Sequence, residues 1–154
     1  MDVDIKDLPA LRVAAVRHMG PYTRINEAFE RLGEVAGAAG LIKPPSVQMI
    51  ALYYDDPEST PENELTSDAG IIVSENVALS GGLEERRVPA GTFACAVYVG
   101  PYESLPDAWG QLMGEWLPAS GRTFREGAPS CELYLNDPST TPKEELRTEI
   151  RIPV

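Results

Sequence analysis

The chain carries one pattern of residues twice, and this repeat constrains its fold more than any other feature. Gly20-Pro21-Tyr22 recurs as Gly100-Pro101-Tyr102, an offset of 80 residues that also relates Ala28, Phe29 and Leu32 to Ala108, Trp109 and Leu112. From Tyr53 onward the offset is 81, because Tyr53, Asp56, Pro57, Thr60, Pro61, Glu64 and Leu65 match Tyr134, Asp137, Pro138, Thr141, Pro142, Glu145 and Leu146. One residue was therefore gained or lost between the two blocks, and both halves share one design.

The length of 154 residues and the 43% content of hydrophobic residues are typical of a single globular domain that buries its own core. We therefore expect one domain over residues 1–154. The repeat divides it into module one over about 1–78 and module two over about 83–154. Residues 79–83, which include Gly81 and Gly82, are the expected seam.

Several classes of function are disfavoured by the composition. The formal net charge of −11 repels a phosphate backbone, so direct binding of nucleic acid is not expected. That charge fits either solubility or attraction to cationic ligands and basic protein surfaces. No apolar run approaches the roughly 20 residues of a membrane-spanning helix, and the acidic start lacks the basic region of a signal peptide. We expect a cytoplasmic protein.

The residues that commonly bind metals are few and badly spaced for that purpose. Cys95 and Cys131 lie in strand-like stretches without metal-ligand spacing, and His18 is the single histidine of the sequence. Buried thiols in a reducing compartment are the expected state of both cysteines. Neither a metal nor another cofactor is expected.

Apolar periodicity predicts the same order of elements in each half: strand, helix, strand, strand. The predicted elements are 11–18, 25–36, 48–54 and 69–73 in the first half, and 93–99, 103–117, 131–135 and 149–152 in the second. Residues 76–87 are a further candidate for strand pairing. Together these elements predict an α+β fold: a tandem duplication that forms an antiparallel sheet with two main helices. Side-by-side modules would leave a central groove on their pseudo-twofold axis, a usual place for a ligand.

One carboxylate breaks the repeat. The offset of 81 puts Glu132 at the position of Ala51, in the middle of an apolar strand. Strand parity places Glu132 and Tyr134 on one face, and Met49, Ala51 and Tyr53 on the matching face of the first half. A carboxylate that loses water must take up a proton or find a hydrogen-bond donor. Such a group suits general acid or base catalysis, or recognition of a lipophilic cation.

The alternative reading of Glu132 is a strand-edge residue, solvated or paired with Arg147 or Arg151. Trp109 and Trp116 lie seven residues apart on one side of the predicted helix, where they serve either the core or a flat cationic ligand. Tyr22 and Tyr102 follow the repeated Gly-Pro, so we interpret both as scaffold residues. His18 and Tyr98 are equivalent strand-end positions, and for His18 a structural role is favoured over ligand binding.

The ordered motifs resemble those of the GyrI-like family, the effector-binding domain that also ends some AraC-type and MerR-type transcription regulators. The resemblance rests on His18-Met19-Gly20-Pro21-Tyr22, Ala28-Phe29, Tyr54-Asp55-Asp56-Pro57, Ala69-Gly70-Ile71, Pro89-Ala90-Gly91, Gly100-Pro101-Tyr102, Trp116-Leu117-Pro118, Ser120-Gly121, Glu132-Leu133-Tyr134 and Asn136-Asp137-Pro138. It covers nearly the whole chain. The chain departs from the regulator pattern because it has no room for a helix-turn-helix reader, so it is not expected to bind promoters itself.

The resemblance implies a ligand groove between two modules and binding of lipophilic, often cationic or aromatic, small molecules. It places Glu132 at the base of the groove, with walls that match Tyr134, Trp109 and Tyr53. Met49, His18 and Tyr98 are further candidate wall residues.

Three functions stay open at this point. The first is a stand-alone protein that binds or sequesters a lipophilic compound. The second is a hydrolase of strained electrophiles, such as cyclopropane-containing toxins, in which Glu132 activates water and Tyr134 donates a hydrogen bond. The third is a protein-interaction role, with DNA gyrase or a separate regulator as the partner.

Overall fold

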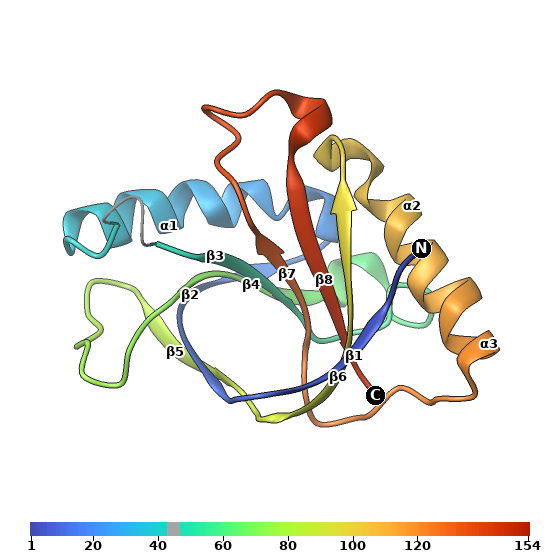
Figure 1. The fold of residues 1–154 in the computed structure, drawn as a ribbon. Helices are drawn as coiled ribbons and strands as arrows, with labels where there is room; N and C mark the ends of the chain where they lie inside the picture. The colour runs from blue at the N-terminus through green and yellow to red at the C-terminus, as the bar shows by residue number, and fades with distance from the viewer. Residues whose placement is uncertain (43–46) are drawn as a thin grey trace. The chain divides into compact units, whose positions relative to one another are not determined.

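The computed structural model describes residues 1–42 and 47–154 (Figure 1). The chain forms two compact units. Unit 1 consists of Met1–Pro9 together with Ala90–Val154, and unit 2 consists of Ala10–Pro89.

Both repeats contain the predicted series of strand, helix, strand and strand, which confirms the α+β class. Unit 2 comprises β2 (Leu11–Met19), η1 (Tyr22–Arg24), α1 (Asn26–Ala38), β3 (Met49–Tyr53), η2 (Glu62–Glu64), β4 (Thr66–Ile72) and β5 (Glu84–Val88). Unit 1 comprises β1 (Asp4–Leu8), β6 (Gly91–Val99), η3 (Tyr102–Ser104), α2 (Leu105–Gly110), η4 (Gln111–Trp116), α3 (Leu117–Ser120), β7 (Ser130–Tyr134), η5 (Lys143–Glu145) and β8 (Arg147–Pro153).

The strands of each unit pair in the same antiparallel register. The strand order is β5-β2-β4-β3 in unit 2 and β1-β6-β8-β7 in unit 1. Ala51 lies opposite Ala69 in unit 2, and Glu132 lies opposite Ile150 in unit 1. These pairs follow the offset of 81 residues. The structure therefore confirms that Glu132 occupies the position of Ala51.

The outer strands do not pair with the strand that follows them in the chain. β1 pairs with β6, and β5 pairs with β2 (Figure 1). Pro9-Ala10 joins β1 to β2, and Pro89-Ala90 joins β5 to β6. A two-residue hairpin requires a positive φ, which proline does not adopt; among the described residues only glycines have positive φ. Neither outer strand can therefore fold back, and Met1–Pro9 joins the unit of the second repeat.

Each helix buries its apolar side against the sheet of its own unit. In unit 2, Ala28, Leu32 and Ala36 of α1 pack against a core cluster that includes Ala14 and Ile71 of the sheet. In unit 1, the cluster contains Ala94, Ala96, Leu105, Ala108, Leu112, Ile150 and Ile152. Trp109 and Trp116 both pack against this second cluster, so they lie on one side of the helix, as their spacing predicted. The helix thereby brings Trp109 onto the sheet face that carries Glu132.

The second helix differs from the continuous helix predicted over 103–117. It changes from α2 to the π-helical segment η4, where the Leu117 N–H bonds to the carbonyl of Leu112 five residues earlier. A π turn accommodates one extra residue in a helix, and the repeat offset changes from 80 to 81 between Leu112 and Cys131. Beyond the turn, Trp116 is half-buried like Val35 in α1, which matches an offset of 81. The inserted residue therefore lies in this turn.

Candidate ligand-binding site around Glu132

Glu132 is buried, with 4% of its surface exposed, and its carboxylate is bound by two side chains of unit 1. The Trp109 Nε1–H donates to Glu132 Oε2 at 2.8 Å. The Tyr134 hydroxyl donates to Glu132 Oε1 at 2.9 Å. Hydrogen bonds from neutral donors stabilise an ionised carboxylate away from water. Both of these hydrogen bonds to the Glu132 carboxylate therefore come from uncharged side chains.

The two repeats differ at both the donor and the acceptor of one of these hydrogen bonds. Tyr134 lies two residues after Glu132 on the same strand, so both side chains project from one face. Trp109 faces that surface from α2. At the equivalent positions unit 2 has Phe29 and Ala51, which offer neither an N–H donor nor a carboxylate. Unit 2 therefore has no counterpart of this hydrogen-bonded group at these positions.

Tyr102 belongs to the site, although the sequence suggested a scaffold role. Its ring meets the Tyr134 ring edge-on, with centroids 5.5 Å apart and an interplanar angle of 66°. Burial raises the pKa of Tyr102, and the negative charges of Asp137 and Glu132 raise it further. The repeat concealed this residue, because its counterpart Tyr22 also packs on a tyrosine ring, that of Tyr53. The sequence signal for Tyr102 is that the tyrosines Tyr22 and Tyr53 both recur, as Tyr102 and Tyr134.

An ion pair of Glu132 with Arg147 or Arg151 is not what the structure contains. Arg151 lies opposite Cys131, on the sheet face away from Glu132, and Arg147 shares the parity of Arg151 on β8. The Arg151 guanidinium instead binds Glu149 on its own strand, at 2.7 Å from Nε and 2.6 Å from Nη2. The reading of Glu132 as the partner of a strand arginine is therefore wrong.

His18 and Tyr98 support equivalent turns. His18 Nε2 lies 3.0 Å from the carbonyl oxygen of Pro21, and the Tyr98 hydroxyl donates to the carbonyl of Pro101 at 2.8 Å. Both contacts hold the Gly-Pro turn that starts the next helix. Their roles as ligand contacts stay predictions, while their contacts in the structure are those of scaffold residues.

The two remaining candidates, Met49 and Tyr53, lie in unit 2. Met49 packs against the core cluster beneath α1, and the Tyr53 ring lies 4.7 Å from the Tyr22 ring. Within unit 1 the structure brings together Glu132, Tyr134 and Trp109. The predicted groove between modules, and a contribution from Met49 and Tyr53, stay predictions.

The described residues 1–42 and 47–154 contain no group of three or more His, Cys, Asp and Glu side chains arranged to hold a metal ion. Cys95 and Cys131 are buried free thiols. Burial raises the pKa of Cys131 to about 12, so its thiol stays protonated at neutral pH. In the same part of the chain, no helix is long and apolar enough to cross a membrane.

A family model described as the GyrI-like small molecule binding domain matches residues 1–154. The chain belongs to the GyrI-like family. The resemblance read from the ordered motifs is thereby confirmed over the full chain. This GyrI-like domain is similar to a protein of Yersinia enterocolitica named DNA gyrase inhibitor, at 31% identity over 131 residues that span 82% of the chain and 81% of the relative.

Solved structures share the fold of this GyrI-like domain. The C-terminal domain of EcmrR matches with a TM-score of 0.77 at 21% identity, over 99% of this chain and 96% of that domain. In the EcmrR–DNA complex the chain spans only 56% of the longer protein. The structure of SAV2435 bound to tetraphenylphosphonium matches with a TM-score of 0.72 at 15% identity, over 100% of this chain and 94% of that one.

Proposed function

We propose that this GyrI-like domain binds lipophilic cations at Glu132. The observation that carries the proposal is a buried carboxylate whose two hydrogen bonds within unit 1 come from the neutral donors Trp109 and Tyr134. The carboxylate would attract the charge of a cationic guest, and aromatic rings attract such a guest through their faces. The neighbouring structure of SAV2435 with tetraphenylphosphonium, a lipophilic cation, supports this class of ligand.

The contacts of Tyr134 favour binding over hydrolysis. A hydrolase would need a hydroxyl that donates to the developing anion. Tyr134 has one hydroxyl proton, and it is donated to Glu132 Oε1. The Tyr134 hydroxyl therefore binds the Glu132 carboxylate. We keep hydrolysis of strained electrophiles at Glu132 as the alternative to binding.

Inhibition of DNA gyrase is a second candidate function. It is favoured by the Yersinia relative named DNA gyrase inhibitor, which matches over four fifths of both chains. The net charge of −11 gives such a protein a means to compete for basic surfaces. This candidate concerns the outer surface and is independent of the buried Glu132.

Titration with tetraphenylphosphonium tests the main proposal. In a Trp116→Phe background Trp109 is the remaining tryptophan, so its fluorescence reports on the donor to Glu132. We expect saturable quenching, and we expect Glu132→Gln to weaken binding at least about tenfold, equivalent to roughly 1.4 kcal/mol. The amide keeps the shape of the side chain but removes the charge.

Two controls separate the buried charge from general electrostatics. Glu126→Gln removes an exposed carboxylate of the same unit and should leave the affinity unchanged. Triphenylphosphine oxide, an uncharged analogue, should bind both the parent and Glu132→Gln with equal weakness. Equal affinity of tetraphenylphosphonium for the parent and Glu132→Gln would remove Glu132 from the ligand site.

A further inference from the structure

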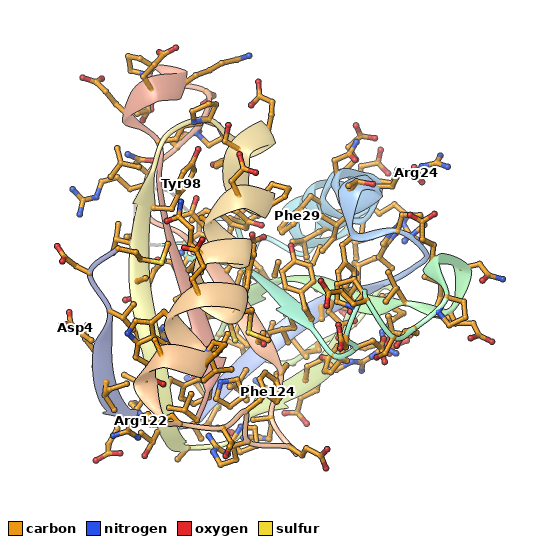
Figure 2. All side chains as sticks on the ribbon, turned by 90° about the vertical axis from the view of Figure 1, so that its right-hand side faces the viewer. Asp4, Arg24, Phe29, Tyr98, Arg122 and Phe124 are labelled. Carbon is orange, nitrogen blue, oxygen red and sulfur yellow. The ribbon has the colours of Figure 1, made fainter. Side chains whose placement is uncertain are left out.

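The sheet of unit 1 carries a hollow on the face that points away from its helix. The hollow has a volume of about 290 Å³. It is lined by Asp2, Asp4, Lys6, Cys95, Val97, Val99, Arg147 and Glu149 from β1, β6, β8 and the residues before β1. Asp4 projects from β1 away from the second helix (Figure 2). The lining residues are not those of the Glu132 site.

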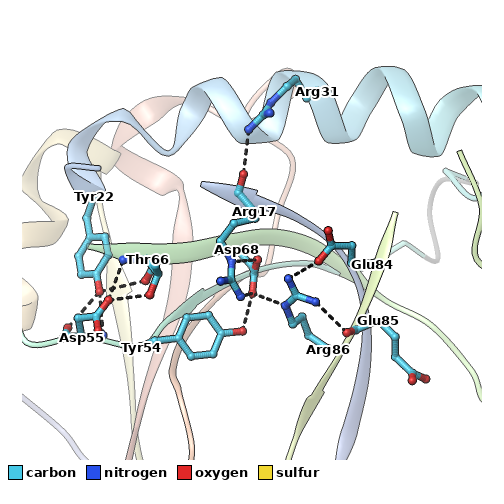
Figure 3. A network of polar contacts seen from close by, with 10 residues as sticks. All are labelled: Arg17, Tyr22, Arg31, Tyr54, Asp55, Thr66, Asp68, Glu84, Glu85 and Arg86. Atoms are coloured by element: carbon cyan, nitrogen blue, oxygen red, sulfur yellow. Dashed lines mark hydrogen bonds and ion pairs between the residues drawn. The ribbon is translucent and has the colours of Figure 1, made fainter. Parts of the chain in front are cut away.

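The equivalent face of unit 2 shows what these positions hold when they are filled (Figure 3). Asp68 is fully buried there and accepts hydrogen bonds from Arg17 Nε at 2.9 Å and Arg86 Nε at 3.1 Å. The Tyr54 hydroxyl also donates to Asp68, and the Arg17 guanidinium lies 5.3 Å from the centre of the Tyr54 ring. Glu84 binds the other side of Arg86. A guanidinium therefore sits among carboxylates and closes this face.

Unit 1 keeps the carboxylates of this arrangement but has Val97 in place of Arg17. Arg17 lies opposite Asp68, and in the same register Val97 lies opposite Glu149. Asp4 takes the position of Glu84, because they pair with Cys95 and Ala15, which the offset of 80 relates. Valine is shorter than arginine, and Val97 lines the hollow.

Among the charged side chains that line the hollow, the acidic Asp2, Asp4 and Glu149 outnumber the basic Lys6 and Arg147. Glu149 is bound by Arg151, with Lys6 at 3.9 Å. Asp2 and Asp4 are exposed, and neither forms an ion pair with a described residue. Val97 and Val99 are 42% and 55% exposed. The valines offer a floor for methylene groups, and the two aspartates offer partners for a cationic head.

We propose that this hollow docks an arginine side chain of a partner protein. The arginine would take in unit 1 the place that Arg17 takes within unit 2, with its stem on Val97 and Val99 and its guanidinium beside Asp2 and Asp4. The equivalence with Arg17 favours guanidinium over ammonium, because its planar fork binds two carboxylate oxygens at once. The inference does not depend on ligand binding at Glu132.

The test is an NMR titration of the isotope-labelled full chain with the peptide acetyl-Leu-Arg-Leu-amide. We expect saturable shifts of the Val97, Val99 and Asp4 amides, and none with acetyl-Leu-Gln-Leu-amide. The double variant Asp2→Asn with Asp4→Asn should weaken binding at least fivefold. Glu126→Gln with Glu144→Gln removes the same charge from exposed sites of unit 1 and should leave binding unchanged.

Val97→Arg is the sharpest variant, because it places the residue of unit 2 into the hollow. We expect it to fold, as judged by its amide spectrum, and to lose the peptide-induced shifts. The inference is overturned if the arginine and glutamine peptides bind equally, if the two double variants behave alike, or if folded Val97→Arg still binds. Binding of acetyl-arginine-amide as tightly as the peptide would also overturn a protein partner in favour of a small ligand.

Discussion

Ser67 and Thr148 are equivalent residues whose hydroxyls are buried without a hydrogen-bond partner in the described part of the chain. Both are fully buried. Thr148 lies between Tyr98 and Tyr134 in the register of unit 1, on the face that carries Glu132. An unsatisfied buried hydroxyl costs about 1–3 kcal/mol. This cost occurs at the same position in both repeats. A change of either residue to an apolar one should therefore stabilise the fold.

We expect Thr148→Val to raise the free energy of unfolding by about 1 kcal/mol, because valine keeps the shape and removes the unsatisfied oxygen. Thermal unfolding measures the effect, which corresponds to roughly 2–4 °C in Tm for a chain of this size. Thr123→Val, at an exposed position, serves as the control and should leave Tm unchanged. A fall in Tm for Thr148→Val would show that the hydroxyl has a partner in solution.

At the level of single residues, the sequence singled out Glu132 and Trp109, which differ between the repeats, and Tyr134, but it did not single out Tyr102. Glu132 was found because Ala51 stands at the equivalent position, and the structure adds that its donors are Trp109 and Tyr134. The donor from the helix, Trp109, reaches Glu132 only because of how the helix packs on the sheet. Residue spacing along the sequence does not give the distance between a helix and a sheet. Tyr102 was missed because a repeated tyrosine has the appearance of scaffold.

At the scale of elements, β1 was the strand that periodicity did not predict. Its sequence, DIKDL, is charged and almost wholly exposed, as is typical of edge strands that avoid pairing with other chains. Hydrophobic alternation finds strands that bury one face, so it located β2 and β6 and passed over β1. The π turn in the second helix was not predicted either, because the change of offset shows that one residue is inserted but not where it lies.

Removal of Met1–Pro9 should weaken unit 1 rather than unit 2, although these residues precede β2 in the chain. Because β1 pairs with β6, we expect amides of β6 to lose protection from hydrogen exchange while those of β4 keep theirs. A synthetic peptide of residues 1–9, added in excess, should restore protection of β6. Removal of Met1 and Asp2 alone, which are both exposed, should change neither strand. Selective loss of protection in β2 would contradict the pairing.

At the scale of the whole molecule, the net charge of −11 decides which large partners are accessible. Acidic proteins associate with basic surfaces through long-range attraction, which salt screens over about 8–10 Å at physiological ionic strength. The proposed inhibition of gyrase would draw on this field. Binding at the buried Glu132 would depend on salt much less.

We expect the purified protein to inhibit supercoiling by DNA gyrase at low salt and to lose most of this effect by about 0.3 M salt, where screening is stronger. A plasmid supercoiling assay across a salt series measures it. Glu132→Gln should inhibit like the parent, because the buried carboxylate contributes little to the outer field. Absence of any salt-sensitive inhibition would count against gyrase as the partner.

The pairing of β1 with β6 also affects the order in which the two units can fold during synthesis. Unit 2 is encoded in one stretch, Ala10–Pro89, and is complete in sequence when its last strand has been made. Unit 1 combines Met1–Pro9, which precede unit 2 in the chain, with Ala90–Val154, which follow it. β1 is therefore synthesised well before its partner β6. Its short, charged sequence disfavours pairing with β2 during this interval, so it does not compete with β5 for that edge.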